Sequence, residues 1–328
     1  MLFYKNLEEI VLNNHLKNNA NELIILSGFV GPSPIEKISK ADIDTKIIYG
    51  CFPRSGISKE LHKKYIKINN NSSAKIFFAR KYNHSKIYCW KKDNVIVDIL
   101  IGSANFSTNG LNNDDEEVLL SVNEDDFTLV ENFLDRTLLN SDNCSSVETS
   151  DKKISVYKNK TFLDEIISID PPKVSMFIGA RGRKIPDKSG INWGHGSGHN
   201  TKDTAELRIR VDLVRRIPQF FPNNGVNINY GSGQSLRNPK PNAEILFDDG
   251  TVMDLSFEQE SKTKDGVFYK AICSYPKKNI LGRYIRRRLG LNNDAKITEK
   301  DLKNYGRDTI ELTLLEEGVY FGDFSVEK

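Results

Sequence analysis

An imidazole and an ammonium group stand two residues apart in the segment NHSKIYCW, at His84 and Lys86. Side chains alternate between the two faces of a strand, so both groups project from one face where this segment is extended. A further strand-like run leads to the segment GSANFS, in which Ser103 and Asn105 follow Gly102 and supply neutral hydrogen-bond donors. The two segments predict a single polar site at strand ends.

A carboxylate follows eleven residues after Asn105. We expect Glu116 to begin a strand over 116–121, where its carboxylate could hold an imidazole. The set suits phosphodiester cleavage, because an imidazole can attack phosphorus while a lysine with Asn and Ser donors neutralises the developing charge. The sequence has no PD-(D/E)xK core, no HNH cysteine frame and no dense acidic cluster for two Mg²⁺ ions. We therefore expect a site that uses no metal and no cofactor, and we interpret the acidic run at 114–117 as a solvated turn.

Each of these short motifs is weak by itself. A lone HxK or a lone GSxN occurs by chance in many proteins. Their order along the chain, their places at strand ends and the glutamate that follows them make the combination specific for this chemistry.

Helical and strand-like patterns alternate around these residues, which predicts an α/β domain, a sheet with flanking helices, over residues 1–142. Ser58 is a candidate N-cap for one of its helices. The expected helices cover 6–18, 58–68 and 125–139, and the expected strands cover 23–30, 45–49, 74–78, 84–90, 95–102 and 116–121.

The composition changes twice further along the chain. Residues 143–165 are rich in Asn, Ser, Asp and Lys and lack apolar periodicity, as is typical of a linker. Residues 166–328 contain short β-like runs separated by Gly and Asn turns, which favours a β-rich domain built as a small barrel. The expected strands cover 173–179, 206–213, 243–247, 251–257, 269–274 and 309–315, and two short helices are expected near 214–220 and 280–289.

Two polar loops of this second domain are candidate DNA contacts, because such loops can reach into a groove of the duplex. Composition alone favours a flexible, solvated loop over a DNA contact for the first of them. A zinc site at His195 and His199 is not expected, since the intervening GSG disfavours a helix. The candidate DNA-binding residues are Arg181, Arg183, Lys184, Lys188, Asn192 and Trp193 in the first loop, and Gln259, Lys262 and Lys264 in the second.

Charge is distributed unevenly. Residues 1–150 hold 17 Lys/Arg against 20 Asp/Glu, a net charge of −3, and the remaining residues hold 30 against 24, a net charge of +6. A basic second half indicates a module that binds a polyanion. The segment 277–289 has a basic, amphipathic helical pattern, for which phosphate contacts or plain solvation are favoured over membrane association.

Several features favour a cytoplasmic protein that does not cross a membrane. The longest apolar run, 95–101, is interrupted by Asp98 and is far shorter than the ~20 residues of a membrane span. The N-terminus lacks the apolar core of a secretory signal. The four cysteines, Cys51, Cys89, Cys144 and Cys273, are scattered and are expected to be reduced thiols.

The first half resembles the phospholipase D superfamily, especially its single-motif nucleases, in the residues His84, Lys86, Ser103, Asn105 and Glu116. It departs from the superfamily at Lys91, where an Asp often stands seven residues after the histidine. The resemblance implies that two chains pair as a homodimer to complete one site. One His84 would then form a phosphohistidine, and the partner's His84 would protonate the leaving oxygen, with Glu116 orienting the ring.

The second half resembles the C-terminal half of the NgoFVII-type restriction endonucleases. The segments that carry this likeness are NWG, FFP, LFDDGT, KAI, ILGRYIRRRLGL and KNYGRDTI. The likeness implies a β-rich pseudobarrel similar to the plant B-three domain, whose two arms grip the major groove of double-stranded DNA. It implies a type II restriction endonuclease with a cognate DNA methyltransferase in the same system.

Three other functions stay open at this point. One is a DNA-binding regulator with an inert nuclease half, and another is a lipid or unspecific phosphodiesterase, which would have no use for a basic β-rich domain. The third is a nuclease subunit that depends on an ATPase partner, since the chain lacks a Walker A motif.

Overall fold

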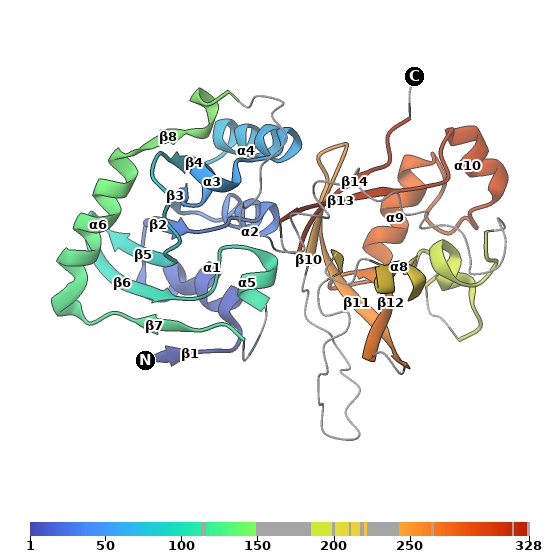
Figure 1. Ribbon diagram of the computed structural model, residues 1–328, viewed down its shortest axis with the longest axis horizontal. Coiled ribbons are helices and arrows are strands. Elements are labelled where there is room, and N and C mark those ends of the chain that lie inside the picture. Colours follow the sequence, from blue (N-terminus) through green and yellow to red (C-terminus); the bar gives the residue numbers. More distant parts are fainter. Residues whose placement is uncertain are drawn as a thin grey trace. The chain divides into compact units, whose positions relative to one another are not determined.

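The chain divides into two compact units, Met1–Asp164 and Glu165–Lys328, in the computed structural model (Figure 1). The predicted arm residues Arg181, Arg183, Lys184 and Lys264 lie outside the residues that it describes, as do the expected strand 173–179 and most of the predicted linker. The structure describes residues 1–112, 114, 116–148, 185–198, 201–209, 211–216, 220–221, 243–263, 266–316 and 318–326.

The N-terminal unit is built on one eight-stranded sheet with the order β1-β7-β6-β5-β2-β3-β4-β8. Strands β2, β3 and β4 are parallel, and the other pairings are antiparallel. The strands are β1 (Leu2–Phe3), β2 (Glu22–Ser27), β3 (Asp44–Tyr49), β4 (Ala74–Ala79), β5 (Ile87–Lys92), β6 (Val95–Gly102), β7 (Leu119–Ser121) and β8 (Ser141–Asn143).

Helices flank this sheet, as the alternating pattern predicts. Apolar residues of the central strands, such as Ile24, Ile48 and Ile99, pack on one face against Leu134 of α6. Helices α1, α2 and α4 contact one another and lie away from α6 (Figure 1). The α-helices are α1 (Leu7–Asn18), α2 (Pro32–Ile38), α3 (Phe52–Ser55), α4 (Lys59–Asn71), α5 (Thr108–Asn112) and α6 (Phe127–Leu139), and the 3-10 helices are η1 (Glu124–Asp126) and η2 (Cys144–Ser146).

The expected elements agree with the structure in most places. Ser58 caps α4, because its side chain accepts a hydrogen bond from the backbone N–H of Leu61 at 3.2 Å. Two predicted strand starts were wrong: β5 begins at Ile87, after the catalytic candidates, and β7 begins at Leu119, so Glu116 lies in the preceding turn. The first residues of the predicted linker belong to β8 and η2.

The C-terminal unit contains a six-stranded sheet with the order β13-β14-β10-β11-β12-β9. Strands β10 and β14 are parallel, and the other pairs are antiparallel. The strands are β9 (Leu207–Arg208), β10 (Ala243–Phe247), β11 (Val252–Thr263), β12 (Gly266–Ser274), β13 (Glu311–Glu316) and β14 (Val319–Asp323). The described helices are α8 (Val211–Arg216), α9 (Asn279–Arg288), α10 (Glu299–Tyr305) and the 3-10 helix η3 (Gly190–His195).

The second predicted polar loop is part of a long hairpin. Strand β11 continues to Thr263 and pairs with β12 as far as Thr263↔Gly266. Gln259 and Lys262 therefore lie on a strand, and their prediction as loop residues was wrong. The paired backbone groups hold the hairpin in one direction, as is expected of one of the two arms that the family resemblance implies.

Two arginines of the basic helix α9 form hydrogen bonds with other parts of the C-terminal unit. Arg286 is fully buried and donates hydrogen bonds to the backbone oxygens of Ala295 and Gly282. Arg288 donates to Asp248 Oδ2 at 2.8 Å and to the backbone oxygen of Phe324 at 2.8 Å. The expectation that the helix serves phosphate contacts or is merely solvated was therefore wrong for both arginines.

Replacing Arg288 is expected to destabilise the protein. Arg288→Ala leaves the half-buried carboxylate of Asp248 without this cation, which costs about 2 kcal/mol in the free energy of unfolding. Urea titration of the full chain measures this loss. The control is Arg287→Ala, because the Arg287 side chain is 66% exposed and we expect a change within about 0.5 kcal/mol. Equal losses in the two variants would show that the half-buried pair is unimportant.

No helix in the described ranges is both long enough and apolar enough to span a bilayer.

Candidate active site

His84 and Lys86 lie in the segment just before β5 and contact each other. Lys86 Nζ is 3.1 Å from His84 Nε2 and 2.7 Å from the backbone oxygen of His84. The imidazole is exposed, whereas Lys86 is buried. The structure therefore presents the predicted nucleophile to solvent with an ammonium group directly behind it.

Burial and charge set the protonation of this pair. Burial lowers the pKa of His84 below its usual value, and the positive charge of Lys86 lowers it further. Burial also lowers the pKa of Lys86, while the negative charges that Cys51 and Glu117 can carry oppose this shift. The lowered pKa favours the neutral form of the His84 imidazole at neutral pH, which is the form that acts as a nucleophile.

Asn105 is held by the turn that follows β2. Its Oδ1 accepts a hydrogen bond from the backbone N–H of Phe29 at 3.1 Å, whereas the Ser27 hydroxyl donates to the backbone oxygen of Phe29 at 2.5 Å and lies 3.4 Å from Oδ1. Ser27 Oγ also accepts from the backbone N–H of Phe106 at 2.9 Å, which fixes the next residue of the GSANFS segment. With Oδ1 engaged by the N–H of Phe29, the amide NH₂ of Asn105 remains available for a phosphoryl oxygen.

Gly28 lies where the two motifs meet. A Cβ atom on Gly28 would stand 2.7 Å from His84 Cδ2 and 3.2 Å from Asn105 Oδ1, and real Cβ atoms do not come as close as the first distance. Backbone at Gly28 thus occupies space that a side chain cannot share with His84. The sequence analysis missed Ser27, Gly28 and Phe29, and the signal available for them was a polar, glycine-containing turn directly after a buried strand.

Aromatic rings border the imidazole. Tyr82 stacks parallel to His84 with ring centroids 6.4 Å apart and planes at 2°, and Phe29 presents its edge at 6.2 Å. The guanidinium of Arg54 lies 3.7 Å from the centroid of the Tyr82 ring. These contacts restrict the orientation of the His84 ring from two sides.

Ser103 and Glu116 lie at or near the turn that leads into β7 and make no contact with His84 that the structure shows. Ser103 Oγ accepts a hydrogen bond from the backbone N–H of Val118 at 3.0 Å, so its hydroxyl fixes the entry to β7. Glu116 is exposed in the turn. The neighbouring Glu117 is half-buried, and it is the carboxylate whose charge acts on Lys86. The structure therefore brings together His84, Lys86 and Asn105, with Glu117 as an additional charge that the sequence analysis overlooked.

The residues near the departure from the superfamily motif have other partners. Lys91 forms an ion pair with Glu131 at 2.7 Å. Asp98 accepts a hydrogen bond from Asn14 at 2.8 Å. Among the described residues, no group of three or more His, Cys, Asp or Glu side chains has an arrangement that could hold a metal ion.

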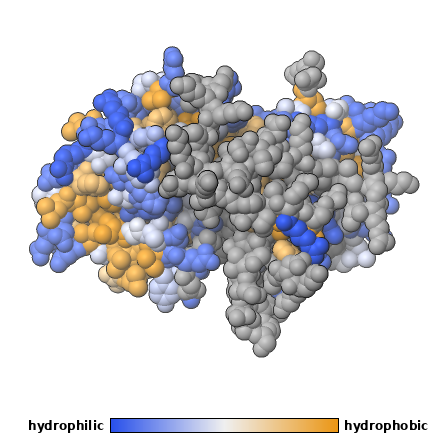
Figure 2. Space-filling model, in the orientation of Figure 1, coloured by the Kyte–Doolittle hydropathy of each residue, from blue (hydrophilic) through white to orange (hydrophobic). Residues whose placement is uncertain are grey.

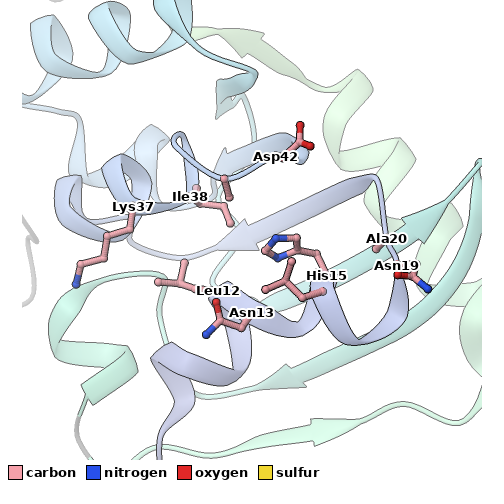
Figure 3. A pocket seen from close by; sticks show the side chains of 10 residues that line it. Leu12, Asn13, His15, Asn19, Ala20, Lys37, Ile38 and Asp42 are labelled. Atoms are coloured by element: carbon pink, nitrogen blue, oxygen red, sulfur yellow. The ribbon is translucent and has the colours of Figure 1, made fainter.

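A separate cavity lies between α1 and α2 in the N-terminal unit (Figure 3). Its volume is about 610 Å³, and its lining includes Leu12, His15, Lys37 and Ile38. None of the candidate catalytic residues lines it. His15 is buried, and its Nδ1 has no hydrogen-bond partner. The cavity is therefore distinct from the phosphodiester site.

The candidate DNA-binding residues Lys188, Asn192 and Trp193 differ in their exposure. Lys188 is exposed and Trp193 is half-buried, with the ammonium group of Lys278 4.7 Å from its ring centroid. Asn192 is fully buried and hydrogen-bonded to the backbone N–H and carbonyl groups of Ile297, so its prediction as a DNA contact was wrong. Its amide links η3 to the segment before α10.

Comparison with known families defines the class of the molecule. Residues 5–151 match the NgoFVII restriction endonuclease N-terminal PLD domain, and residues 166–316 match the NgoFVII C-terminal B3-like DNA-binding domain. The molecule is thus a nuclease with a phospholipase-D-like domain joined to a B3-like domain, and it acts on DNA. The chain belongs to the NgoFVII restriction endonuclease family. This confirms the resemblance and the fold class that the two halves of the sequence indicate.

Solved structures with similar folds were also found. NucT from Helicobacter pylori is 19% identical with a TM-score of 0.33, and the match covers 44% of this chain and 97% of NucT. Nuc from Salmonella typhimurium, a phospholipase D family member, is 18% identical with a TM-score of 0.29, covering 38% and 84%. Polyphosphate kinase from Porphyromonas gingivalis is 13% identical with a TM-score of 0.31, covering 44% and 23%. No curated protein matches the chain.

Proposed function

We propose that the chain is a type II restriction endonuclease that hydrolyses DNA without a metal ion, through a phosphohistidine at His84. The observation that carries this proposal is the contact between His84 and Lys86 beside Asn105, around the backbone of Gly28. A neutral imidazole, a buried ammonium group and an amide NH₂ form a nucleophile with two donors for phosphoryl oxygens.

The reaction has two steps. A lone pair of the His84 imidazole attacks phosphorus, an N–P bond forms, and the P–O bond to the leaving oxygen breaks. Lys86 and the amide of Asn105 stabilise the charge on the non-bridging oxygens. Water then attacks the phosphohistidine, the N–P bond breaks, and the imidazole returns to its starting state with a 5′- or 3′-phosphate released.

The leaving oxygen needs a proton, which we assign to His84 of a second chain in a homodimer. The N-terminal unit offers no other suitable imidazole. His15 lies in the cavity between α1 and α2, and His62 is buried with its Nε2 2.8 Å from the backbone oxygen of Cys144. The negative charge of the bound phosphodiester favours the protonated form of the second imidazole.

The C-terminal unit supplies recognition of a short double-stranded sequence, at or near which the cut is made. The B3-like domain and the β11–β12 hairpin support this part of the proposal. Such an enzyme also requires a DNA methyltransferase of the same sequence specificity to protect the host DNA. We place it in the cytoplasm, which is consistent with the four buried, free cysteines.

Cleavage of unmethylated phage DNA in EDTA, without added metal, tests the proposal. Discrete fragments are expected, because the site supplies its own nucleophile and positive charge. A smear would retain the chemistry and remove sequence specificity. Cleavage only after addition of Mg²⁺ would refute metal independence, whereas a requirement for ATP and a partner would make the chain a subunit of a larger system. Specific binding without cleavage under any of these conditions would instead identify a regulator.

A further inference from the structure

Gln259 has a backbone conformation that is unusual for a strand residue. Its φ is 62°, in the left-handed region, although its neighbours Glu258 and Glu260 pair in register with Ala271 and Tyr269 of β12. A non-glycine residue in this conformation is strained by about 1–3 kcal/mol and persists only where the surroundings require it. The register continues on both sides, so the distortion changes the direction of one side chain without displacing the hairpin.

The Gln259 side chain meets a buried carboxylate. Glu206 is fully buried, and its Oε2 accepts a hydrogen bond from Gln259 Nε2. Its other oxygen, Oε1, accepts from Arg208 Nη1 at 3.2 Å. The backbone N–H of Glu206 donates to Gly190 at 3.0 Å, which anchors the carboxylate to η3. One buried acid therefore holds two polar side chains that come from β9 and β11.

Strand register places Arg208 and Leu207 on opposite faces of the sheet. Leu207 pairs with Ile272, and both are buried among the apolar side chains of the unit. Arg208 pairs with Ala271 and points the other way, where its side chain is 41% exposed. Ala271 beside it is fully buried, whereas the Arg208 side chain stays partly exposed.

The protonation state of Glu206 determines which hydrogen-bonding groups point outward. Burial raises the pKa of Glu206, and the hydrogen bond and charge of Arg208 oppose this shift. In its ionised form the carboxylate can only accept hydrogen bonds, which directs the NH₂ of Gln259 toward Glu206 and its carbonyl Oε1 away. Arg208 uses Nη1 on Glu206 and retains further N–H groups in its planar fork. The pair thus presents several donors beside one acceptor, as a fixed pattern.

We propose that Arg208 and Gln259 read two bases of the recognition sequence and that Glu206 is the positioning residue for both. This inference rests on the proposed function. The fork of Arg208 matches the O6 and N7 acceptors of guanine in the major groove, and the outward Oε1 of Gln259 accepts an amino hydrogen from adenine N6 or cytosine N4. Glu206 would contact no base, and its role is to determine the direction of the two side chains.

Selection from a pool of randomised duplexes tests this assignment. The full chain is used in the His84→Ala background, so that bound DNA is not cut. We expect the parent protein to enrich a sequence that contains a guanine and a separate adenine or cytosine position. Arg208→Lys should reduce discrimination at the guanine by about tenfold to a hundredfold, because lysine lacks the bidentate fork.

Glu206→Gln gives the sharpest result. An amide at this position can donate a hydrogen bond, so the Gln259 amide can rotate and direct its NH₂ outward. The preference at that base is then expected to change from adenine or cytosine to guanine or thymine, whose O6 and O4 are acceptors. Gln259→Gly should abolish the preference at the same position and leave the other positions unchanged, with the backbone strain relieved.

The outcomes separate the two levels of the proposal. A parent protein that enriches no sequence would overturn the proposed sequence-specific function. An enriched sequence that all three variants reproduce unchanged would overturn the reading assignment alone. A uniform loss of binding at every position in Glu206→Gln, with Gln259→Gly unchanged, would show that Glu206 only stabilises the fold, and this would also overturn the assignment.

Discussion

His84→Ala abolishes DNA cleavage, with an expected loss of at least about 10⁴-fold in rate, because the variant has no nucleophile. DNA binding should stay within about twofold of the parent protein, since His84 belongs to the N-terminal unit and recognition is assigned to the other. Single-turnover cleavage of a labelled duplex and a binding titration measure the two quantities. The control is His15→Gln, which alters another histidine of the same unit, outside the site, and should retain cleavage.

Mixing parent and His84→Ala chains tests the composite site. When dimers form at random from equal amounts of the two chains, about one quarter of the dimers contain two intact histidines. The cleavage activity should therefore fall to about one quarter of that of the parent protein at the same total chain concentration. A value of about one half would indicate that each chain cuts independently, and the homodimeric mechanism would then be wrong. Quenching with an alkaline denaturant during turnover should yield DNA bound covalently to the protein through a phosphoramidate that is stable to alkali and labile to acid, as expected of an N–P bond.

Gly28→Ala is expected to lower the cleavage rate by at least about a hundredfold without unfolding the protein. The added Cβ would stand 2.7 Å from His84 Cδ2, so the imidazole must move away from Lys86 and Asn105. Small displacements of reacting groups have large effects on rate because the reaction depends on their alignment. Single-turnover kinetics at saturating enzyme separate this effect from a change in DNA binding.

A second glycine of the N-terminal unit serves as the control for this variant. Gly56 has a φ of 64° and no atom within 4 Å of an added Cβ. Gly56→Ala should cost about 1–3 kcal/mol in stability, because its φ of 64° and ψ of −158° lie in a region that is nearly restricted to glycine, and should leave the rate unchanged. Normal cleavage by Gly28→Ala would mean that the imidazole is placed differently during catalysis from the arrangement described above.

The sequence predicts which residues lie together in the candidate site better than it predicts the strand ends that position them. His84, Lys86 and Asn105 could be found because each motif is short and its residues lie close together in the chain. Gly28 lies in the turn after β2, and its place beside His84 depends on the β2–β5 pairing, which no local pattern encodes. The choice between Glu116 and Glu117 depends on where β7 begins, and the acidic run offers no local signal for that position.

Fold class and the positions of α1, α4, α6 and α9 followed from periodicity, whereas the shorter helices and the roles of polar residues did not. The predicted strand 206–213 was wrong beyond Arg208, because α8 begins at Val211. Asn192 is typical of a polar loop by composition, yet its amide is fully buried and satisfies the backbone of Ile297. Gln259 was expected in a loop but lies on β11. A polar segment between apolar runs is typical both of a loop and of a hairpin that is polar on both faces, so the pattern does not distinguish them. Tertiary contacts decide both cases.

The two arginines of α9 that face into the protein, one buried and one half-buried, alter how the charge of the C-terminal unit should be counted. Arg286 and Arg288 donate to backbone oxygens and to Asp248, so their guanidinium groups are directed into the protein. Counterions are released from DNA only by cations that reach its phosphates. The +6 net charge of the second half therefore overstates the number of ions exchanged on binding, and the affinity for DNA is less sensitive to salt than the count of basic residues implies.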